Sequence, residues 1–116
     1  IVFRLQEAYL LMAEVMAQQN RIAEGVNYLN AVRHLAGLVD VSSTITKDVL
    51  LAEILSESRR EFFSERGIRF LNLKRNEKLD ILSTVKPNWK SFYVLWPIPL
   101  SELALNPSLN PQNNGY

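Results

Sequence analysis

Hydrophobic residues recur at steps of three and four residues through the first third of the chain, which is the spacing of helices that bury one face. The steps predict one helix over residues 2–19 and a second over residues 22–36, with Gly37 as the glycine that ends the second helix. Asn20 is expected in the left-handed conformation that closes a helix. So short a connection between two helices predicts an antiparallel helical hairpin.

Two small residues, Ala13 and Gly25, interrupt the large side chains of this hairpin. Glycine lowers the stability of a helix interior, so Gly25 predicts a close contact between the two helices. The large residues around them are Tyr9, Met12, Met16, Leu29 and Val32. This spacing resembles the tetratricopeptide hairpin, in which small residues let two helices nest. A single repeat of this kind needs neighbours to bury its faces.

A third helix is predicted over residues 47–66, with Thr46 as its N-cap and Gly67 as its end. Its pattern places Leu51, Leu55, Ser58, Phe62 and Arg66 on one face, and Leu50, Ile54 and Glu61 on another. A short helical run that ends at Arg75 is expected to follow. Residues 60–75 hold the densest mixture of charged and aromatic residues in the chain.

The remainder is interrupted by prolines, which exclude long helices; they stand at positions 87, 97, 99, 107 and 111. Alternation over residues 92–96 suits a short strand or a packed extended segment, and residues 101–105 suit one helical turn. The predicted class is all-α. Residues 1–116 are predicted to form a single fragment. It comprises a tetratricopeptide-like hairpin (1–37), a long helix with a short one after it (46–75) and an irregular proline-rich tail (85–116).

The composition argues against several classes of function. The 116 residues suffice for one domain, and 13 basic against 12 acidic side chains leave a net charge of +1, which does not favour nucleic acid. The absence of cysteine excludes a disulfide scaffold and a thiolate zinc site. His34 is the single histidine, so no histidine pair can hold a metal, and we expect a surface imidazole near a helix end. No cofactor is expected, and no run of about eighteen apolar residues that would span a bilayer is present.

The sequence contains no recognisable catalytic set. No serine lies in a Gly-x-Ser-x-Gly turn, and the four glycines are too scattered for a phosphate loop. Three carboxylates, Glu57, Glu61 and Glu65, could form an acid and base set. Arginines at positions 59, 60, 66 and 69 favour structural ion pairs instead. We therefore expect a protein that is not an enzyme.

Aromatic residues gather around the proline turns of the tail: Trp89, Phe92, Tyr93 and Trp96. Rings on rigid loops can stack on ligands such as the faces of sugars. The favoured alternative is that they fold back and cover the third helix. Trp89, in a polar context, and Tyr93 are the candidates for ligand stacking.

Three blocks of sequence occur in one order along the chain. They are residues 8–14 with 28–38, residues 60–75, and the tail segments 85–89, 95–99, 101–103, 106–110 and 112–116. Together they resemble the SusD/RagB-like outer-membrane nutrient-binding lipoproteins of Bacteroidetes. The motif residues of the resemblance are Glu61, Gly67, Arg69, Phe70, Arg75, Pro97, Pro99 and Tyr116.

The chain departs from the family pattern at several positions. Ile68 stands where the family usually has His, Leu71 where it has Phe, and Asn72 where it has Asp; the terminal Asn-Pro-Gly-Tyr is here Asn113 to Tyr116 with Asn114 for Pro. Losing the Asp at position 72 is expected to weaken an ion pair with a neighbouring arginine such as Arg69 or Arg75.

The resemblance implies the C-terminal part of a longer, non-enzymatic protein that binds glycans or, in some members, peptides. It implies an N-terminal lipid anchor outside these residues, an outward-facing place on the outer membrane, and a SusC-like TonB-dependent transporter as partner. The family's sugar contacts lie mostly upstream, so these residues would complete the helical scaffold and the transporter-facing surface. The alternative is a helical-repeat module that binds other proteins.

Overall fold

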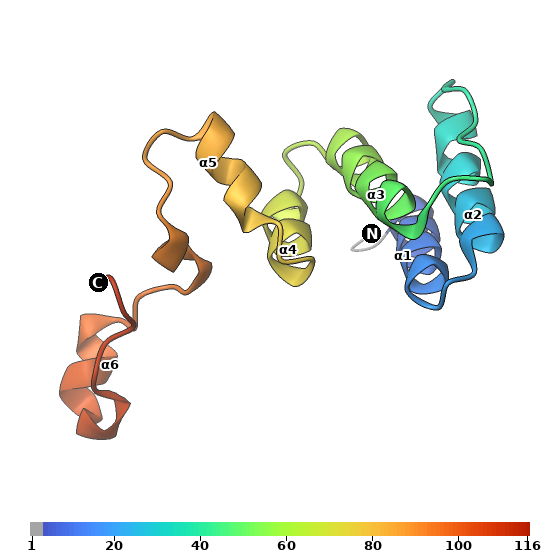
Figure 1. Cartoon of the computed structure of the whole chain (residues 1–116). Coiled ribbons are helices and arrows are strands. Elements are labelled where there is room, and N and C mark those ends of the chain that lie inside the picture. Colours follow the sequence, from blue (N-terminus) through green and yellow to red (C-terminus); the bar gives the residue numbers. More distant parts are fainter. Residues whose placement is uncertain (1–3) are drawn as a thin grey trace. The chain divides into compact units, whose positions relative to one another are not determined.

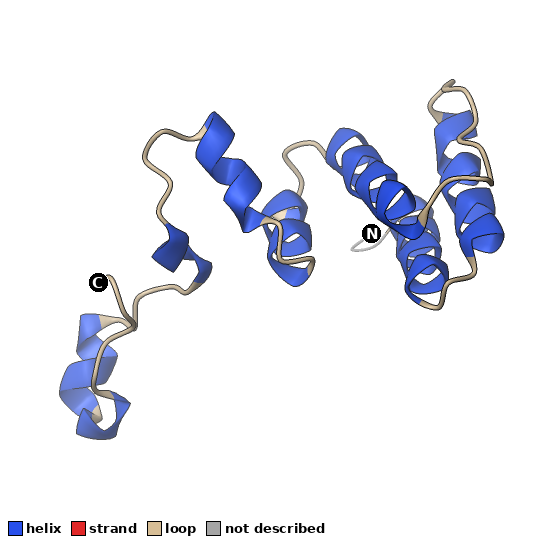
Figure 2. Cartoon of the chain, in the orientation of Figure 1, coloured by secondary structure: helices blue, strands red, loops and turns tan. Residues whose placement is uncertain are grey.

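The computed structural model describes residues 4–116, and every regular element in that range is a helix (Figures 1 and 2). The prediction of an all-α protein is confirmed. Contacts along the chain divide it into two compact units, Ile1–Asn72 and Leu73–Tyr116. Each unit is described by itself.

The first unit opens with a helical hairpin of α1 (Leu5–Gln18) and α2 (Ile22–Leu35). Asn20 has a φ of 62°, and the next amide, of Arg21, donates to the Met16 carbonyl at 2.8 Å, which closes α1. The predicted hairpin and the left-handed Asn20 are therefore confirmed (Figure 1). The predicted start of the first helix at residue 2 lies outside the described residues.

Gly25 is the point of closest approach within this unit. A Cβ at this position would lie 2.9 Å from the Leu50 side chain and 3.0 Å from the Ala13 carbonyl oxygen. The first distance would force the Leu50 side chain to shift and the second is tighter than most Cβ contacts, so glycine fits here without rearrangement. The predicted close contact exists, and it involves the third helix as well as the first.

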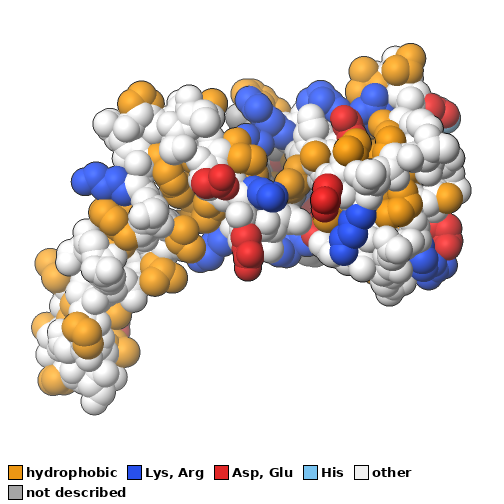
Figure 3. Space-filling model, viewed as in Figure 1, with side chains coloured by type: hydrophobic (Ala, Val, Ile, Leu, Met, Phe, Trp, Pro, Cys, Tyr) orange, Lys and Arg blue, Asp and Glu red, His pale blue; other side chains and the backbone are white. Residues whose placement is uncertain are grey.

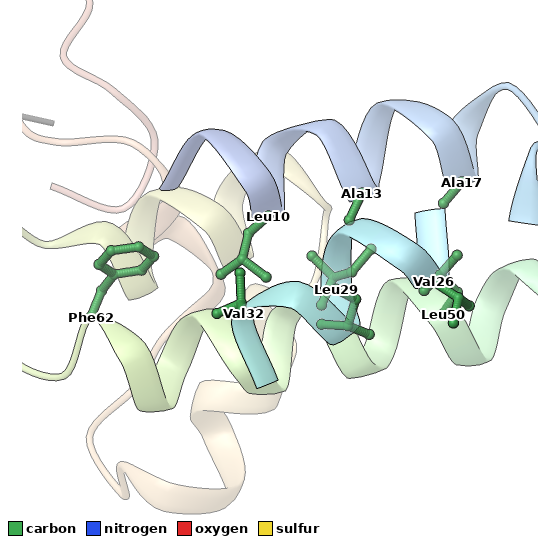
Figure 4. Packing of buried hydrophobic residues seen from close by; sticks show 9 residues of the cluster. Leu10, Ala13, Ala17, Val26, Leu29, Val32, Leu50 and Phe62 are labelled. Carbon is green, nitrogen blue, oxygen red and sulfur yellow. The ribbon is translucent and has the colours of Figure 1, made fainter. Parts of the chain in front are cut away.

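The third helix, α3 (Lys47–Glu61), lies against α1 and α2 and completes the core. The Thr46 hydroxyl accepts a hydrogen bond from the Val49 amide at 3.3 Å, so the predicted N-cap is confirmed. Figure 4 shows the side chains that meet in this core. They are Leu10, Ala13, Ala17, Val26, Leu29, Val32, Leu50, Ile54 and Phe62.

The buried side of α3 draws on both predicted faces. Leu50 and Ile54 are buried together with Glu57, whereas Leu51 and Leu55 are only partly buried. Ser58 and Phe62, from the other predicted face, are buried as well. Burial of Glu57 is possible because an arginine from α2 meets it, as described below.

The predicted end of the third helix, near Arg66, is wrong. The helix stops at Glu61, whose carbonyl oxygen accepts a hydrogen bond from Arg4 Nη2 at 2.6 Å. The chain then turns through Ser64 and Arg66, with φ of 60° and 44°, and Gly67, with φ of 67°. Gly67 thus closes the turn before α4 (Ile68–Arg75), the predicted short helix, rather than ending α3.

The second unit contains only short helices. They are η1 (Leu79–Ile81), α5 (Leu82–Val85), η2 (Ser91–Val94), α6 (Leu100–Leu105) and η3 (Pro107–Leu109), where η denotes a 3₁₀ helix. The expected turn at residues 101–105 is part of α6. The strand considered for residues 92–96 is wrong, because the Tyr93 amide donates to the Lys90 carbonyl at 3.0 Å and coils the backbone.

Candidate functional site

Four aromatic side chains of the second unit form one cluster: Trp89, Phe92, Tyr93 and Tyr116, called here the ring cluster. Trp89 and Tyr93 meet edge to face, with ring centroids 5.7 Å apart and planes at 75°. Phe92 meets Tyr93 at 4.8 Å and Tyr116 at 5.1 Å, again edge to face. Each such pair adds about 0.5–1.5 kcal/mol beyond the area it buries. The structure thus places the two candidate stacking residues, Trp89 and Tyr93, side by side.

Polar groups near Tyr116 hold the backbone that carries this cluster. The Gln112 amide group accepts from the Ile98 N–H and donates to the Ile98 carbonyl, both at 2.8 Å. Asn113 Nδ2 donates to the Trp96 carbonyl at 2.6 Å, and the Tyr116 hydroxyl donates to the Leu95 carbonyl at 2.8 Å. We call these three side chains the terminal clamp. It ties residues 95–98 to residues 112–116.

Gly115 allows Tyr116 to reach the ring cluster. Its φ is 98°, and a Cβ there would lie 2.3 Å from Cγ of Phe92. Both observations exclude any other residue without rearrangement. The terminal Gly-Tyr of the motif therefore has a direct packing role.

Trp96 lies apart from the ring stacking, and 76% of it is exposed. Leu100 and Leu105 are each 81% exposed in the same unit. Figure 3 shows hydrophobic side chains at the surface over the segment that contains α6. Pro97 and Pro99 flank Ile98 in this stretch, and Pro99 is the N-cap residue of α6.

The three candidate carboxylates are engaged in ion pairs rather than arranged as an acid and base set. Glu57, 1% exposed, meets Arg33 Nη1 at 3.1 Å and Arg60 Nη2 at 2.6 Å. Glu61 and Glu65 both pair with Arg4, at 3.2 Å and 3.1 Å. The prediction of structural ion pairs is confirmed. Two of the partners, Arg4 and Arg33, come from parts of the chain that sequence spacing did not connect with α3.

The remaining motif residues sit around α4. Asn72 Nδ2 donates to the Ser58 hydroxyl at 2.8 Å and so links α4 to α3. Burial and, secondarily, the positive charge of Arg59 lower the pKa of Arg69 below its ordinary value. Phe70 is half-buried, and Arg75 lies in the last turn of the helix. Asn72, a neutral side chain, thus bonds to a hydroxyl group at the position where a carboxylate was expected.

A small apolar pocket lies on the hairpin of the first unit, with a volume of about 160 Å³. Its lining residues are Leu5, Gln6, Tyr9, Ala31, Val32 and Leu35. Leu5 and Leu35, at its rim, are 67% and 75% exposed. Nothing in the sequence pattern singled out this surface, because its residues were assigned to the two buried faces of a repeat.

His34 is exposed and contacts Asp40, as a surface imidazole was expected to be. Across residues 4–116, no three His, Cys, Asp or Glu side chains lie close enough to hold a metal ion. Within the same range, no helix has the length and apolar character needed to cross a membrane.

The fold is that of a helical scaffold built on a tetratricopeptide-like hairpin, followed by a tail organised by aromatic rings. The chain belongs to the SusD family, whose model matches residues 1–86. It is 30% identical over 129 residues to SusD-like protein P25 of Formosa agariphila, an alignment that covers 100% of this chain and 24% of that protein. It is 32% identical over 127 residues to the starch-binding protein SusD of Bacteroides thetaiotaomicron, covering 99% of this chain and 21% of that protein.

SusD-like protein P38 of Formosa agariphila is 30% identical over 125 residues, with 100% of this chain and 24% of that protein covered. The chain therefore spans about a quarter or less of the length of these relatives. No solved structure matches it.

Proposed function

We propose that this chain is the C-terminal part of a surface protein that captures glycans without modifying them. The observation that carries the proposal is membership of the SusD family, together with a starch-binding relative that aligns with 99% of the chain. The ion-paired state of Glu57, Glu61 and Glu65 supports a binding role over hydrolysis, because each carboxylate is held by an arginine.

The proposal includes a setting for the whole protein. We place it on the outward face of the outer membrane, held by a lipid at the N-terminus of the longer polypeptide, beside a SusC-like TonB-dependent transporter. In this setting residues 1–37 and 46–75 supply part of the helical scaffold, and residues 85–116 form a surface that faces ligand or transporter. Exposed Trp96, Leu100 and Leu105 support an interacting role for that surface.

Within this chain, Trp89 and Tyr93 are the proposed sugar-stacking residues. Their rings meet edge to face at 5.7 Å, and both side chains are partly exposed. Edge-to-face contact fixes the orientation of each ring while leaving part of its surface available to a pyranose face.

The test is an affinity screen of the full-length polypeptide that contains this chain, against neutral oligosaccharides such as maltohexaose and against peptides. Trp89→Ala and Tyr93→Ala are each expected to weaken binding of the preferred oligosaccharide about tenfold, a loss of about 1.4 kcal/mol, because each removes one of the two rings. Phe63→Ala is the control, since it removes an exposed aromatic side chain of the first unit, outside the proposed surface. Equal losses in all three variants, or none in any, would contradict the assignment of this site.

The apolar pocket on the hairpin supports a second candidate function, a helical-repeat module that binds protein segments. Binding of peptides but not oligosaccharides by the full-length polypeptide, with loss of peptide affinity in Tyr9→Ser, would favour this alternative.

A further inference from the structure

Tyr116 neighbours two of the other rings in the ring cluster. Its ring meets Phe92 edge to face, with centroids 5.1 Å apart and planes at 80°, and lies tilted against Tyr93 at 6.3 Å and 37°. Phe92 in turn meets Tyr93 at 4.8 Å. Tyr93, one of the two proposed stacking residues, is therefore bordered by Trp89 and by two rings that also contact each other.

Tyr116 is itself held through its backbone and through the end of its side chain. The hydroxyl donates to the Leu95 carbonyl at 2.8 Å, and the backbone amide donates to the Asn113 carbonyl at 3.3 Å. Gly115, where a Cβ would lie 2.3 Å from Cγ of Phe92, lets the backbone before Tyr116 pass close to the rings. The Tyr116 ring therefore has a fixed place from which it can restrict its neighbours.

Burial is not the main contribution of Tyr116 to the second unit. Tyr116 is 46% exposed, whereas the buried hydrophobic residues of this unit are at most 6% exposed; they are Leu73, Leu79 and Leu82. Tyr93 is half-buried, so part of its freedom depends on the rings beside it. Loss of the Tyr116 side chain is therefore expected to change the freedom of Tyr93 more than it changes the core of the unit.

We propose that Tyr116 is a positioning residue for the sugar-stacking ring of Tyr93. It holds this ring in its bound orientation before a glycan arrives, and it acts through Tyr93 rather than through a contact of its own with the glycan. A ring that is already oriented binds more tightly than one that must be ordered during binding, because that ordering costs entropy. This inference rests on the proposed glycan-binding function.

The first experiment needs no ligand and measures the state of the Tyr93 ring. The full-length polypeptide is treated with tetranitromethane to limited conversion, and nitration of Tyr93 is quantified by mass spectrometry of its peptide. Tyr116→Ala is expected to accelerate nitration of Tyr93, because one side of the ring is released. Gly115→Ala is expected to do the same while keeping every ring, since its Cβ would displace Phe92 or Tyr116.

The second experiment is isothermal titration of the same polypeptide with maltohexaose, in a double-mutant cycle. Tyr116→Ala is expected to weaken binding about fivefold, the effect of having to order one side chain on binding. In a Tyr93→Ala background the same change is expected to have no further effect, because the ring that Tyr116 positions is already absent. Tyr116→Phe keeps both ring contacts and is expected to recover most of the affinity.

Asn114→Ala is the matched control, since it changes an exposed residue of the same segment and is expected to alter neither nitration nor affinity. The thermal midpoint and circular dichroism of each variant show that it is folded. A purely structural role for Tyr116 would lower the midpoint and would weaken binding equally with and without Tyr93.

Tyr93 nitration at the same rate in the wild type, Tyr116→Ala and Gly115→Ala would overturn the proposal, whatever the titrations show. A fivefold loss that persists in the Tyr93→Ala background would also overturn it, because Tyr116 would then act independently of Tyr93. Faster nitration in the variants, without oligosaccharide binding by the wild type, would support Tyr116 as the residue that holds Tyr93 and reject the glycan site. The two proposals therefore fail separately.

Discussion

At the scale of single residues, buried charge shapes the first unit more than any other feature. Glu57 is 1% exposed and its partner Arg33 is 11% exposed, yet the carboxylate lies within 3.1 Å of the guanidinium. Arg33 Nε also donates to the Val39 carbonyl at 2.9 Å, so one side chain joins α2, the following loop and α3. Removing either partner would leave a buried charge with one partner fewer: Glu57 would keep Arg60, and Arg33 would keep Glu53 at 3.7 Å.

Arg33→Ala is therefore expected to lower the free energy of unfolding by about 3 kcal/mol, since an isolated buried charge costs about 3–5 kcal/mol and Arg60 still offsets part of it. Urea unfolding of the full-length polypeptide, followed by circular dichroism, measures the loss. The control is Arg21→Ala, where the ion pair is exposed and little change is expected. Similar midpoints for both variants would show that Glu57 is not anchored by Arg33.

Glu24 provides a prediction about pH. The hydrogen bond from Arg21 Nε, at 2.7 Å, and the charge of Arg21 hold the pKa of this carboxyl below its ordinary value of 4.5, although desolvation opposes them. The folded state thus binds the proton more weakly than the unfolded state. The stabilisation is complete above the unfolded pKa and is lost as pH falls through the folded one.

An NMR titration of Glu24 should therefore give a midpoint below 4.5 in the wild type and a higher one in Arg21→Ala. An unchanged midpoint would show that the pair is open in solution.

At the scale of elements, the contact of α1, α2 and α3 at Gly25 sets the spacing of the helices. A methyl group there would overlap the Leu50 side chain and the Ala13 carbonyl. Leu50 can move, whereas the α1 backbone cannot move without separating the hairpin. The spacing of the three helices is therefore sensitive to the addition of one methyl group at position 25.

Gly25→Ala is expected to destabilise the protein by about 1–3 kcal/mol, the usual cost of overpacking, despite the better helix propensity of alanine. Thermal unfolding checks the direction. Asn27→Ala, at an exposed position of the same helix, is the control and is expected to be neutral or stabilising. A more stable Gly25→Ala variant would mean that the helices adjust freely.

Helix periodicity was sufficient to predict α1, α2, α4 and the Thr46 cap, because these depend on residues close in sequence. It failed at the end of α3, which depends on Arg4, 57 positions away from Glu61. It also failed for η2, where ring packing and local hydrogen bonds override an alternating pattern. For the candidate site, Trp89 and Tyr93 were recognisable as aromatic residues beside prolines, whereas the contacts of Tyr116 with Phe92 and with the Leu95 carbonyl join residues far apart in sequence.

At the scale of the whole molecule, the chain combines a net charge of +1 with several exposed large hydrophobic residues. Charge repulsion between copies is therefore weak, and apolar surface is available for contact. Leu5 and Leu35, at the rim of the hairpin pocket, illustrate this surface.

Residues 1–116 expressed alone are consequently expected to self-associate as concentration rises, as measured by sedimentation velocity. Leu5→Ser with Leu35→Ser should shift the distribution towards monomer, because the two side chains are 67% and 75% exposed and contribute little to the core. Asn27→Ser serves as the polar control. A wild-type chain that stays monomeric and unfolds cooperatively at every concentration would contradict this expectation.

The terminal clamp has a consequence for biosynthesis. Gln112 and Tyr116 bind backbone groups that precede them by 14 and 21 positions, so a ribosome must add residue 116 before the ring cluster can close. A message with a stop codon just upstream of Gln112 would yield a chain in which Phe92 and Tyr93 lack their contact with Tyr116, and in which the backbone of residues 95–98 lacks its side-chain partners. Synthesis of residues 112–116 is thus the step that allows the ring cluster to close.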